Sequence, residues 1–470
     1  MLFPTFDFLL FFLVVAAAMT ALDGRFLAKK AVLVAASYFF YAQWDWRFCF
    51  LLAFSTAVSY VAGLLIGGIA EARFRRAVLT AAVAVHLCLL GTFKYFDFFV
   101  LSTNEFAHLL GLEHELPFLE VLLPVGISFF TFHGISYITD VYRGDVAVCR
   151  QPLDMALYMS FFPQLVAGPI VRAAYFLPQL ARPSREPLPI APALVLILQG
   201  LFKKVVIANY LATGLVDPVF AAPTSYGGPD LLLAVYAYAV QIYCDFSAYT
   251  DMAIALAALL GFRFPRNFNQ PYRSQRLREF WQRWHISLSS WLRDYLYKPL
   301  GGNRHGQLKT YRNLLITMLL GGIWHGAGWK FVMWGALHGG GLSVERMIEP
   351  WIGRRPTSLA GKVLATAIVF HFVCLAWVFF RAEDFEIAWL YIGGLGAGWG
   401  EGVQQAGPFV VGLTALGLLT QFVPADWFER TANAVAQLPN WGLGALAGLV
   451  VAVINALGPE GVAPFIYFRF

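Results

Sequence analysis

A histidine within a long apolar stretch, His325, is the residue of this sequence best suited to chemistry. It belongs to the segment GGIWHGAGW (321–329), and the apolar run 313–342 around it holds only two other ionisable side chains, Lys330 and His338. An ionisable group at membrane depth is costly, which makes it a functional candidate by default. A nearly neutral imidazole can accept a proton as a general base. The alternative is a packed histidine that bonds to a neighbouring helix.

A second histidine, His285, precedes His325 in a segment rich in aromatic and basic residues. We interpret it as a second polar residue of the cavity that holds His325; the alternative is an interfacial histidine without a chemical role. Four nearby arginines can hold the phosphates of a cytosolic donor such as coenzyme A through charge-assisted hydrogen bonds. The alternative for them is contact with anionic lipid. They are Arg273, Arg276, Arg278 and Arg283.

Three further residues are candidates for lining the same cavity. Trp324 is adjacent to His325, Asn303 follows the basic segment, and Asp245 opens a polar patch in the sequence YCDFSAYTD. The patch can equally cap a helix. Motifs of zinc proteases, P-loop nucleotidases, dinucleotide-binding domains and α/β-hydrolases are missing from the sequence. We expect neither a metal cofactor nor a nucleic-acid partner.

The elements that carry these residues are those of a membrane protein. Of the 470 residues, 59% are hydrophobic and 13% are charged, whereas soluble domains are about a quarter charged. The sequence predicts an all-α polytopic protein in contact with membrane lipids. As one helix, the run 313–342 would be ~45 Å long against ~30 Å of hydrocarbon. The glycines on both sides of His325 therefore predict a break. The runs 31–44 and 386–399 look too short to span alone.

The segment before Asn303 predicts a helix of another kind. Apolar and aromatic residues recur at helical spacing from Leu277 to Tyr295, with arginines and serines on the opposite face. Pro271 disfavours a helix through it, so the helix should begin near Ser274. This pattern predicts one amphipathic helix at the headgroup level.

The basic loops predict the orientation of the chain. They lie at 25–30, 73–76, 143–150, 172–185 and 263–312, and all fall on one side, which the positive-inside rule makes cytoplasmic. The N-terminus is then outside. Keeping Arg354 and Arg355 inside requires the run 313–342 to enter and return. If the short run 386–399 does not cross, which we favour, the C-terminus is also outside.

Several stretches together resemble the membrane-bound O-acyltransferase (MBOAT) family. The most specific are FWQRWHISLSSWLRDYLYKPLGGN and NLLITMLLGGIWHGAGW, and the likeness is closest to the bacterial members that take part in alginate O-acetylation. Supporting stretches are LLPVGISFFTFHGISYITDVYRGD, FFPQLVAGPIVR and YCDFSAYTDMAIALAALLGFRFPRNFNQPY. The resemblance runs through most of residues 30–345. Cys244, where an aromatic residue is more usual, is a small departure without chemical consequence.

The resemblance implies a fold, a reaction and a set of partners. It implies a single MBOAT domain over 1–470, with N-terminal helices (1–115), a catalytic core (116–345) and C-terminal helices with an aromatic tail (346–470). About ten or eleven membrane helices, with re-entrant and interfacial helices, would surround a central tunnel. An acyl group, we expect acetyl, would pass from a cytosolic thioester such as acetyl-CoA toward an exported bacterial polysaccharide, with alginate or cellulose as the leading acceptors.

The resemblance also assigns roles to residues. His325 would be the principal catalytic residue and His285 the second important position. A hydrogen-bond donor must also face the carbonyl oxygen; His285, Asn303 or a backbone N–H between Gly321 and Gly328 can supply it. Related envelope-polymer systems have an aromatic tail around one tyrosine that is thought to carry the acyl group, and the tail PFIYFRF places Tyr467 at that position. The alternative for Tyr467 is an interfacial anchor.

The expected setting is the bacterial inner membrane. The expected partners are a periplasmic SGNH-hydrolase-like acetyltransferase and the machinery that makes and exports the polymer. Two alternatives remain at this point. One is an acyltransferase for lipid, peptidoglycan or teichoic acid, and the other is a polysaccharide transporter or flippase.

Overall fold

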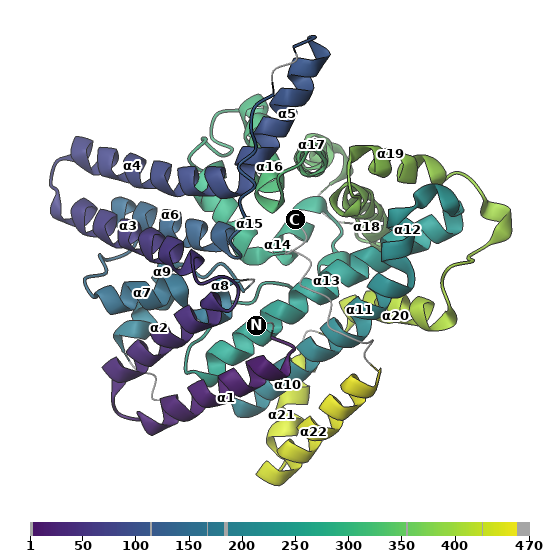
Figure 1. The fold of residues 1–470 in the computed structure, drawn as a ribbon. Coiled ribbons are helices and arrows are strands. Elements are labelled where there is room, and N and C mark those ends of the chain that lie inside the picture. Colours follow the sequence, from purple (N-terminus) through teal and green to yellow (C-terminus); the bar gives the residue numbers. More distant parts are fainter. Residues whose placement is uncertain are drawn as a thin grey trace. The chain divides into compact units, whose positions relative to one another are not determined.

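The computed structural model describes residues 3–112, 115–166, 168–182, 187–353, 356–424 and 426–457. All regular elements in these ranges are helices (Figure 1), which confirms the predicted all-α membrane protein. Several helices begin at a residue whose side chain accepts a hydrogen bond from the first turn, including Thr5 before α1 (Phe6–Ala21) and Ser358 before α18 (Leu359–Arg381). Apolar composition and local capping together therefore define these elements.

Five of the described helical stretches are long and apolar enough to cross a membrane, and a bent pair at 408–436 would make a sixth. This number is smaller than the ten or eleven expected, because several apolar helices are short. The two predicted short runs correspond to α2 (Phe26–Ala42) and to α19 (Phe385–Gly394). The five are Phe48–Gly68, Ala72–Leu109, Ile190–Ala221, Gly228–Leu259 and Leu359–Arg381.

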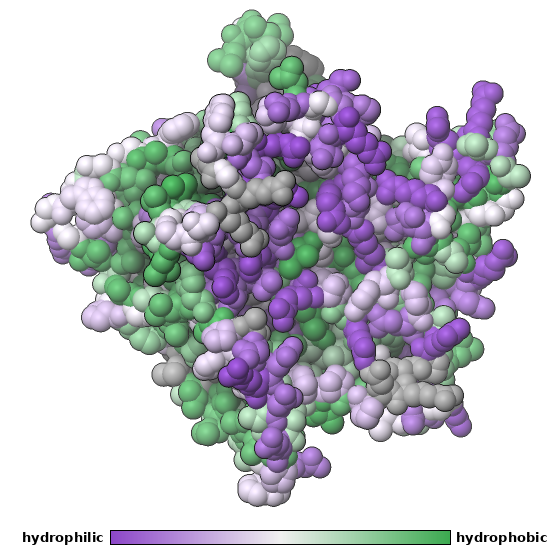
Figure 2. Space-filling view, turned by 180° about the vertical axis from the view of Figure 1, so that it is seen from behind, coloured by the Kyte–Doolittle hydropathy of each residue, from purple (hydrophilic) through white to green (hydrophobic). Residues whose placement is uncertain are grey.

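The surface includes hydrophobic side chains, as the space-filling view shows (Figure 2). On α3 (Phe48–Gly68), for example, Phe50, Phe54 and Val61 are half or more exposed. Large exposed apolar patches mark interaction sites or membrane contact. In a chain with several membrane-crossing helices, contact with lipid tails accounts for them.

The described chain divides into two compact units, which we consider separately. The first comprises residues up to Leu188 together with Leu256–Phe264. Its helices are α1, α2, α3, α4 (Ala72–Leu90), α5 (Phe96–Leu109), α6 (Ile127–Arg143), α7 (Pro152–Ser160), α8 (Phe162–Leu165) and α9 (Ala173–Ala181), with a π-helix, η1 (Gly91–Tyr95), before α5. Small residues let α3, α4 and α6 approach closely: a Cβ on Gly134 would lie 2.6 Å from the His86 ring.

The second unit comprises Pro189–Ala255 and Pro265–Phe470, so it holds the predicted site residues that the structure describes. Its first half contains α10 (Ile190–Leu201), η2 (Phe202–Ala208), α11 (Asn209–Leu211), η3 (Ala212–Val216), α12 (Asp217–Ala221), η4 (Pro223–Ser225), the long helix α13 (Gly228–Leu259) and η5 (Pro271–Arg273). Within the 18-residue apolar stretch of α13 that could cross a membrane, 83% of the residues are buried.

The second half of this unit begins with α14 (Leu277–Arg283), α15 (Ile286–Leu292), η6 (Arg293–Tyr297), α16 (Gln307–His325) and α17 (Trp329–Ile352). After α18 and α19 come η7 (Trp399–Glu401), α20 (Pro408–Leu419), η8 (Thr420–Phe422), α21 (Trp427–Ala436) and α22 (Asn440–Leu457). The predicted break in the run 313–342 is confirmed, since α16 ends at His325 and α17 starts after three residues.

Helices α16 and α17 pack side by side (Figure 1) as a hairpin, with three residues between them. Glycines let their backbones touch: a Cβ on Gly335 would lie 2.4 Å from the Met318 carbonyl oxygen, and one on Gly339 would lie 2.9 Å from Leu315 Cα. The chain therefore reverses direction within the apolar run, as the predicted entry and return require.

The single amphipathic helix expected from Ser274 to Tyr295 is wrong in two respects. The helix is interrupted at Trp284 and His285, which leaves the short helices α14 and α15. Its apolar side chains are also buried within the protein instead of facing lipid. Both helices pack against one aromatic core, so the apolar spacing continues through the interruption. The most deeply buried of these side chains are Leu277, Phe280, Trp284 and Leu288.

Candidate active site

His325 is the last residue of α16, where the helix gives way to extended backbone at Gly326. Its side chain is buried, with a residue exposure of 3%. The imidazole packs edge-on against two aromatic rings, with centroid distances of 4.9 Å to Trp334 on α17 and 5.3 Å to Phe380 on α18. The turn of the hairpin thus places an ionisable ring in an apolar enclosure.

His285 is also buried and also lies at an interruption between helices. It precedes α15 with φ 42° and ψ 56°, a left-handed conformation that is unfavourable for a residue other than glycine. Its ring packs at 4.6 Å from the ring of Phe246 on α13. His285 lies outside the membrane-length helices, and burial lowers its pKa to about 3, which keeps the imidazole neutral.

The Trp324 ring packs against both histidines. Its ring centroid lies 5.0 Å from that of His325 and 6.1 Å from that of His285. The structure therefore brings three of the predicted residues together around one indole, although 40 positions separate the histidines in the sequence. Two buried imidazoles at one location can supply a base and a hydrogen-bonding partner for a reaction on a small group.

Asn267 is a neighbour of His285 that was missing from the predicted site. It is fully buried, and its backbone oxygen accepts a hydrogen bond from the Ile286 N–H at 2.9 Å. Its side-chain oxygen accepts from the Ser287 N–H at 3.0 Å and lies 3.4 Å from His285 Nδ1. An asparagine in an irregular loop gives no pattern that would identify this contact from the sequence.

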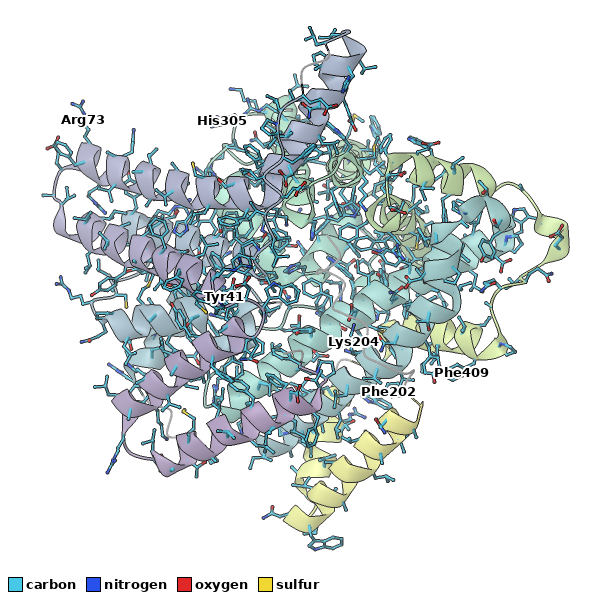
Figure 3. All side chains as sticks on the ribbon, viewed as in Figure 1. Tyr41, Arg73, Phe202, Lys204, His305 and Phe409 are labelled. Atoms are coloured by element: carbon cyan, nitrogen blue, oxygen red, sulfur yellow. The ribbon has the colours of Figure 1, made fainter. Side chains whose placement is uncertain are left out.

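Asp245 is engaged in a buried ion pair. Its carboxylate lies 2.7 Å from Nζ of Lys204, which is labelled in Figure 3. The preceding lysine, Lys203, makes a second pair with Asp251 on α13 at 2.8 Å. Buried charges require such partners, so the predicted polar patch of α13 neutralises two lysines on η2.

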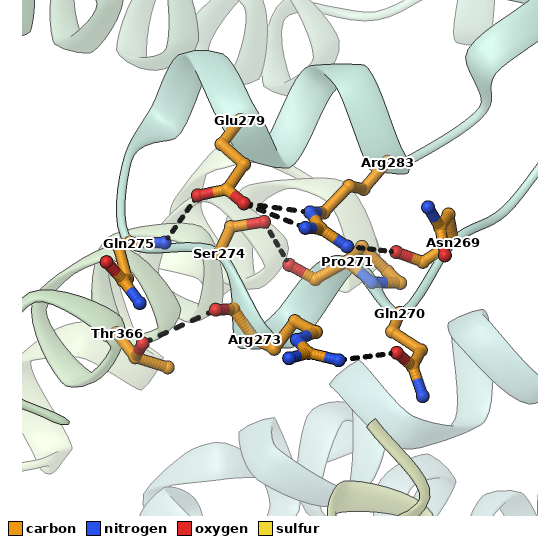
Figure 4. Close-up of polar contacts among 9 residues, drawn as sticks. All are labelled: Asn269, Gln270, Pro271, Arg273, Ser274, Gln275, Glu279, Arg283 and Thr366. Atoms are coloured by element: carbon orange, nitrogen blue, oxygen red, sulfur yellow. Dashed lines mark hydrogen bonds and ion pairs between the residues drawn. The ribbon is translucent and has the colours of Figure 1, made fainter. Parts of the chain in front are cut away.

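Three of the four candidate donor-binding arginines have partners within the protein. As Figure 4 shows, Arg273 donates to Gln270 at 2.8 Å, and Arg283 pairs with Glu279 and donates to the Asn269 carbonyl oxygen. Arg276 pairs with Glu349 at 3.1 Å and donates to the Gly353 carbonyl.

Arg278 differs from the other three arginines. Its side chain is exposed and has neither a hydrogen bond nor an ion pair among the described residues. Its backbone N–H donates to Glu345 at 3.1 Å. Of the four, Arg278 is therefore the one whose charge is most available to an external anion.

The remaining predicted residues lie elsewhere. Asn303 is exposed in the turn between η6 and α16, apart from the buried histidines. Tyr467, Arg354 and Arg355 lie outside the described residues. Within the described ranges, no group of three histidine, cysteine, aspartate or glutamate side chains could hold a metal ion.

Comparison with known proteins gives consistent relationships. Residues 148–396 match the membrane-bound O-acyltransferase family. The chain is 46% identical over 365 residues to the probable alginate O-acetylase AlgI of Azotobacter vinelandii, which covers 77% of this chain and 71% of the relative. It is 40% identical over 389 residues to the peptidoglycan O-acetyltransferase of Helicobacter pylori, covering 77% and 72% of the two chains.

A more distant relative matches a shorter part of the chain. The chain is 30% identical over 280 residues to the teichoic acid D-alanyltransferase of Bacillus subtilis, which covers 56% of this chain and 69% of the relative. The family match spans more than half of the sequence, and it coincides with several long apolar helices. The chain therefore belongs to the membrane-bound O-acyltransferase (MBOAT) family and is a multi-pass membrane enzyme.

Proposed function

We propose that this enzyme moves acetyl groups from a cytosolic thioester, acetyl-CoA, across the bacterial inner membrane for O-acetylation of an exported polysaccharide. The observation that carries the proposal is the pair of buried histidines, His325 and His285, around Trp324. The identity of 46% to a probable alginate O-acetylase supports alginate as the acceptor, with cellulose as a further candidate.

In this proposal His325 promotes the transfer. Attack of a hydroxyl on a thioester requires a base for the hydroxyl proton and a donor near the carbonyl oxygen, where negative charge develops. His325 would serve as the base. The backbone N–H groups of the break between α16 and α17 and the second histidine, His285, are the candidates for the donor. The exposure of Asn303 makes it a poorer candidate.

The donor would enter from the cytoplasm and meet its acceptor in a tunnel through the protein, so that coenzyme A need not cross. The exposed charge of Arg278 supports a role in holding the donor phosphates. Arg273, Arg276 and Arg283 would contribute mainly by shaping this entrance, since their guanidinium groups already have protein partners.

On the far side, the acetyl group would leave on Tyr467 or on a serine of a periplasmic SGNH-hydrolase-like partner that works with the polymer synthase and export complex. We propose that both termini are periplasmic. A phenol has a pKa of ~10, far below that of an alkyl alcohol. An acetylated Tyr467 would therefore remain reactive toward a sugar hydroxyl. Normal polymer acetylation in Tyr467→Phe, which keeps the ring and removes the hydroxyl, would reject this carrier role.

A second candidate is transfer to peptidoglycan, teichoic acid or lipid. Two relatives support this candidate. They are the peptidoglycan O-acetyltransferase of H. pylori and the teichoic acid D-alanyltransferase of B. subtilis. Membranes containing the enzyme and its partners, supplied with radiolabelled acetyl-CoA, would distinguish the two. Label on alginate or cellulose supports the first proposal, and label only on peptidoglycan, teichoic acid or lipid supports the second.

The same assay separates an acyltransferase from a polysaccharide transporter. His325→Ala should abolish label transfer while the amount of protein in the membrane stays normal. If label transfer is unchanged in that variant, His325 is not catalytic and the proposed mechanism fails.

A further inference from the structure

The backbone around His285 is organised by a single residue, Asn267. Three of its contacts reach the residues 285–287: one from the backbone oxygen to Ile286, and two from the side-chain oxygen to Ser287 and to the His285 ring. Its amide nitrogen faces the Thr250 hydroxyl at 3.5 Å. Asn267 is fully buried, so these contacts are shielded from competing water.

The Ser287 N–H determines which end of the Asn267 amide faces His285. A backbone N–H can only donate, so the amide atom 3.0 Å from it must be the oxygen. The same oxygen lies 3.4 Å from His285 Nδ1. An amide oxygen can only accept, so this contact is favourable only when Nδ1 carries the proton. The Ser287 hydroxyl, also 3.4 Å from Nδ1, can donate or accept, so it does not determine which ring nitrogen carries the proton.

The other ring nitrogen, Nε2, then has a free lone pair. It is buried, and it has no hydrogen-bond partner among the described residues. The rings that pack against the imidazole are aromatic side chains: Phe246 from α13, Phe268 from the preceding loop and Trp324 from α16. A buried nitrogen with unused acceptor capacity calls for an explanation, and a substrate hydroxyl at this position would supply one.

We infer that Asn267 is a positioning residue that holds His285 as the Nδ1–H tautomer, so that Nε2 acts as a hydrogen-bond acceptor toward the hydroxyl substrate. The role for that hydroxyl rests on the proposed acyl transfer. The tautomer itself does not. A consequence is that neutral His285 cannot donate to the thioester oxygen from Nε2. That donor must come from another group, such as a backbone N–H in the break after His325.

The tautomer can be read directly by ¹⁵N NMR of the detergent-solubilised full chain with ¹⁵N-imidazole histidine. The two ring nitrogens of a neutral histidine give separate signals according to which carries the proton. The chain has nine histidines, and the signal that disappears in His285→Gln belongs to His285. We expect a protonated Nδ1 and an unprotonated Nε2. A proton on Nε2 overturns the inference, whatever reaction the enzyme performs.

Kinetics test the positioning role. Asn267→Leu keeps the shape but removes the acceptor, and removing the partner of a buried hydrogen-bonding group commonly costs about 10- to 100-fold. We expect that loss in kcat, with the KM for acetyl-CoA within about threefold of wild type. Asn313→Leu is the matched control, because Asn313 is a buried asparagine of the same unit that bonds Gly302 and Arg312 instead. It should retain kcat.

Asn267→Asp separates positioning from packing. The carboxylate still accepts from the Ser287 N–H and from Nδ1–H, so kcat should recover to within about tenfold of wild type. Its negative charge should also favour protonation of the ring and move the acid limb of the pH–rate profile upward. A purely structural role would not move that limb. An unchanged profile with a loss equal to that of Asn267→Leu would contradict the inference.

Discussion

The two buried histidines lie at helix interruptions that are built by different means. After His325 the backbone is extended, with φ near ±180° at Gly326 and Gly328, a conformation that any residue can adopt. Glycine is required at 326 because of space: a Cβ there would lie 2.0 Å from the Phe331 ring. At His285 the backbone is left-handed and carries a full side chain, and hydrogen bonds to Asn267 hold it.

We call the interruption after His325 the steric break, because it depends on space, and the interruption at His285 the polar break, because it depends on hydrogen bonds. The break after His325 is made by residues next to it in the chain, and it lets α17 fold back on α16. The break at His285 stores strain of about 1–3 kcal/mol, which hydrogen bonds of about 1 kcal/mol each can offset. Adding volume should therefore destabilise the backbone conformation after His325. Removing a hydrogen-bond acceptor should destabilise the one at His285.

The largest effect should follow from removing the imidazole at the steric break. We expect His325→Gln to lower acetyl transfer by about 10²–10⁴-fold, the usual contribution of a general base, because glutamine fills the space but is not basic. The measurement is the initial rate of label transfer from acetyl-CoA, normalised to the amount of folded protein.

His338→Gln provides the control for that change. His338 is a fully buried histidine of the same hairpin, packs at 4.8 Å from the Trp334 ring and accepts a hydrogen bond from Trp281. It should lose less than about tenfold. An equal loss in both variants would mean that the aromatic core, and not the imidazole of His325, carries the effect.

An intermediate effect is expected from adding one methyl group at the steric break. Gly326→Ala would force its Cβ into the Phe331 ring, and overpacking of this kind costs about 1–3 kcal/mol. We expect a lower thermal midpoint in detergent together with slower acetyl transfer.

Gly328→Ala is the matched control, two residues away. Its Cβ would meet Lys330 and Phe331 at 3.8 Å, an ordinary contact distance, and its φ of −176° suits any residue. Stability should change by less than about 0.5 kcal/mol. If the two alanine variants behave alike, the close packing of Phe331 does not define the break.

The smallest effect concerns the arginines beside the polar break. Arg278→Ala should raise the KM for acetyl-CoA about two- to fivefold, as expected for one exposed charge contact, and leave kcat near wild type. Arg430→Ala, which removes an exposed arginine on α21, should leave the KM unchanged. Equal KM values for wild type and Arg278→Ala would exclude Arg278 from donor binding.

The same contrast explains what could be predicted from the sequence. The break after His325 was predictable because its glycines are neighbours of the histidine, and the length of the apolar run required a turn. The all-α membrane fold followed from composition and run lengths. The structure places His285 and His325 against one indole, while a shared cavity and their catalytic roles remain proposals.

The polar break was not predictable, because its partner is distant and its apolar pattern is continuous. Trp281, Trp284 and Leu288 keep helical spacing across the interruption, since α14 and α15 face one core. Likewise, the ion pair of Asp245 with Lys204 was not predictable, because it joins positions on separate helices. Contacts between side chains that are remote in sequence leave no periodic signal.

The central claim is that the two breaks form one site, and a double-mutant cycle tests it most directly. Rates of acetyl transfer would be measured for His325→Gln, His285→Gln and the double variant, each checked for normal folding. Residues that act as a unit give non-additive losses. We predict that the double variant is no more than about threefold slower than the slower single variant. Losses that multiply in full would contradict a shared site.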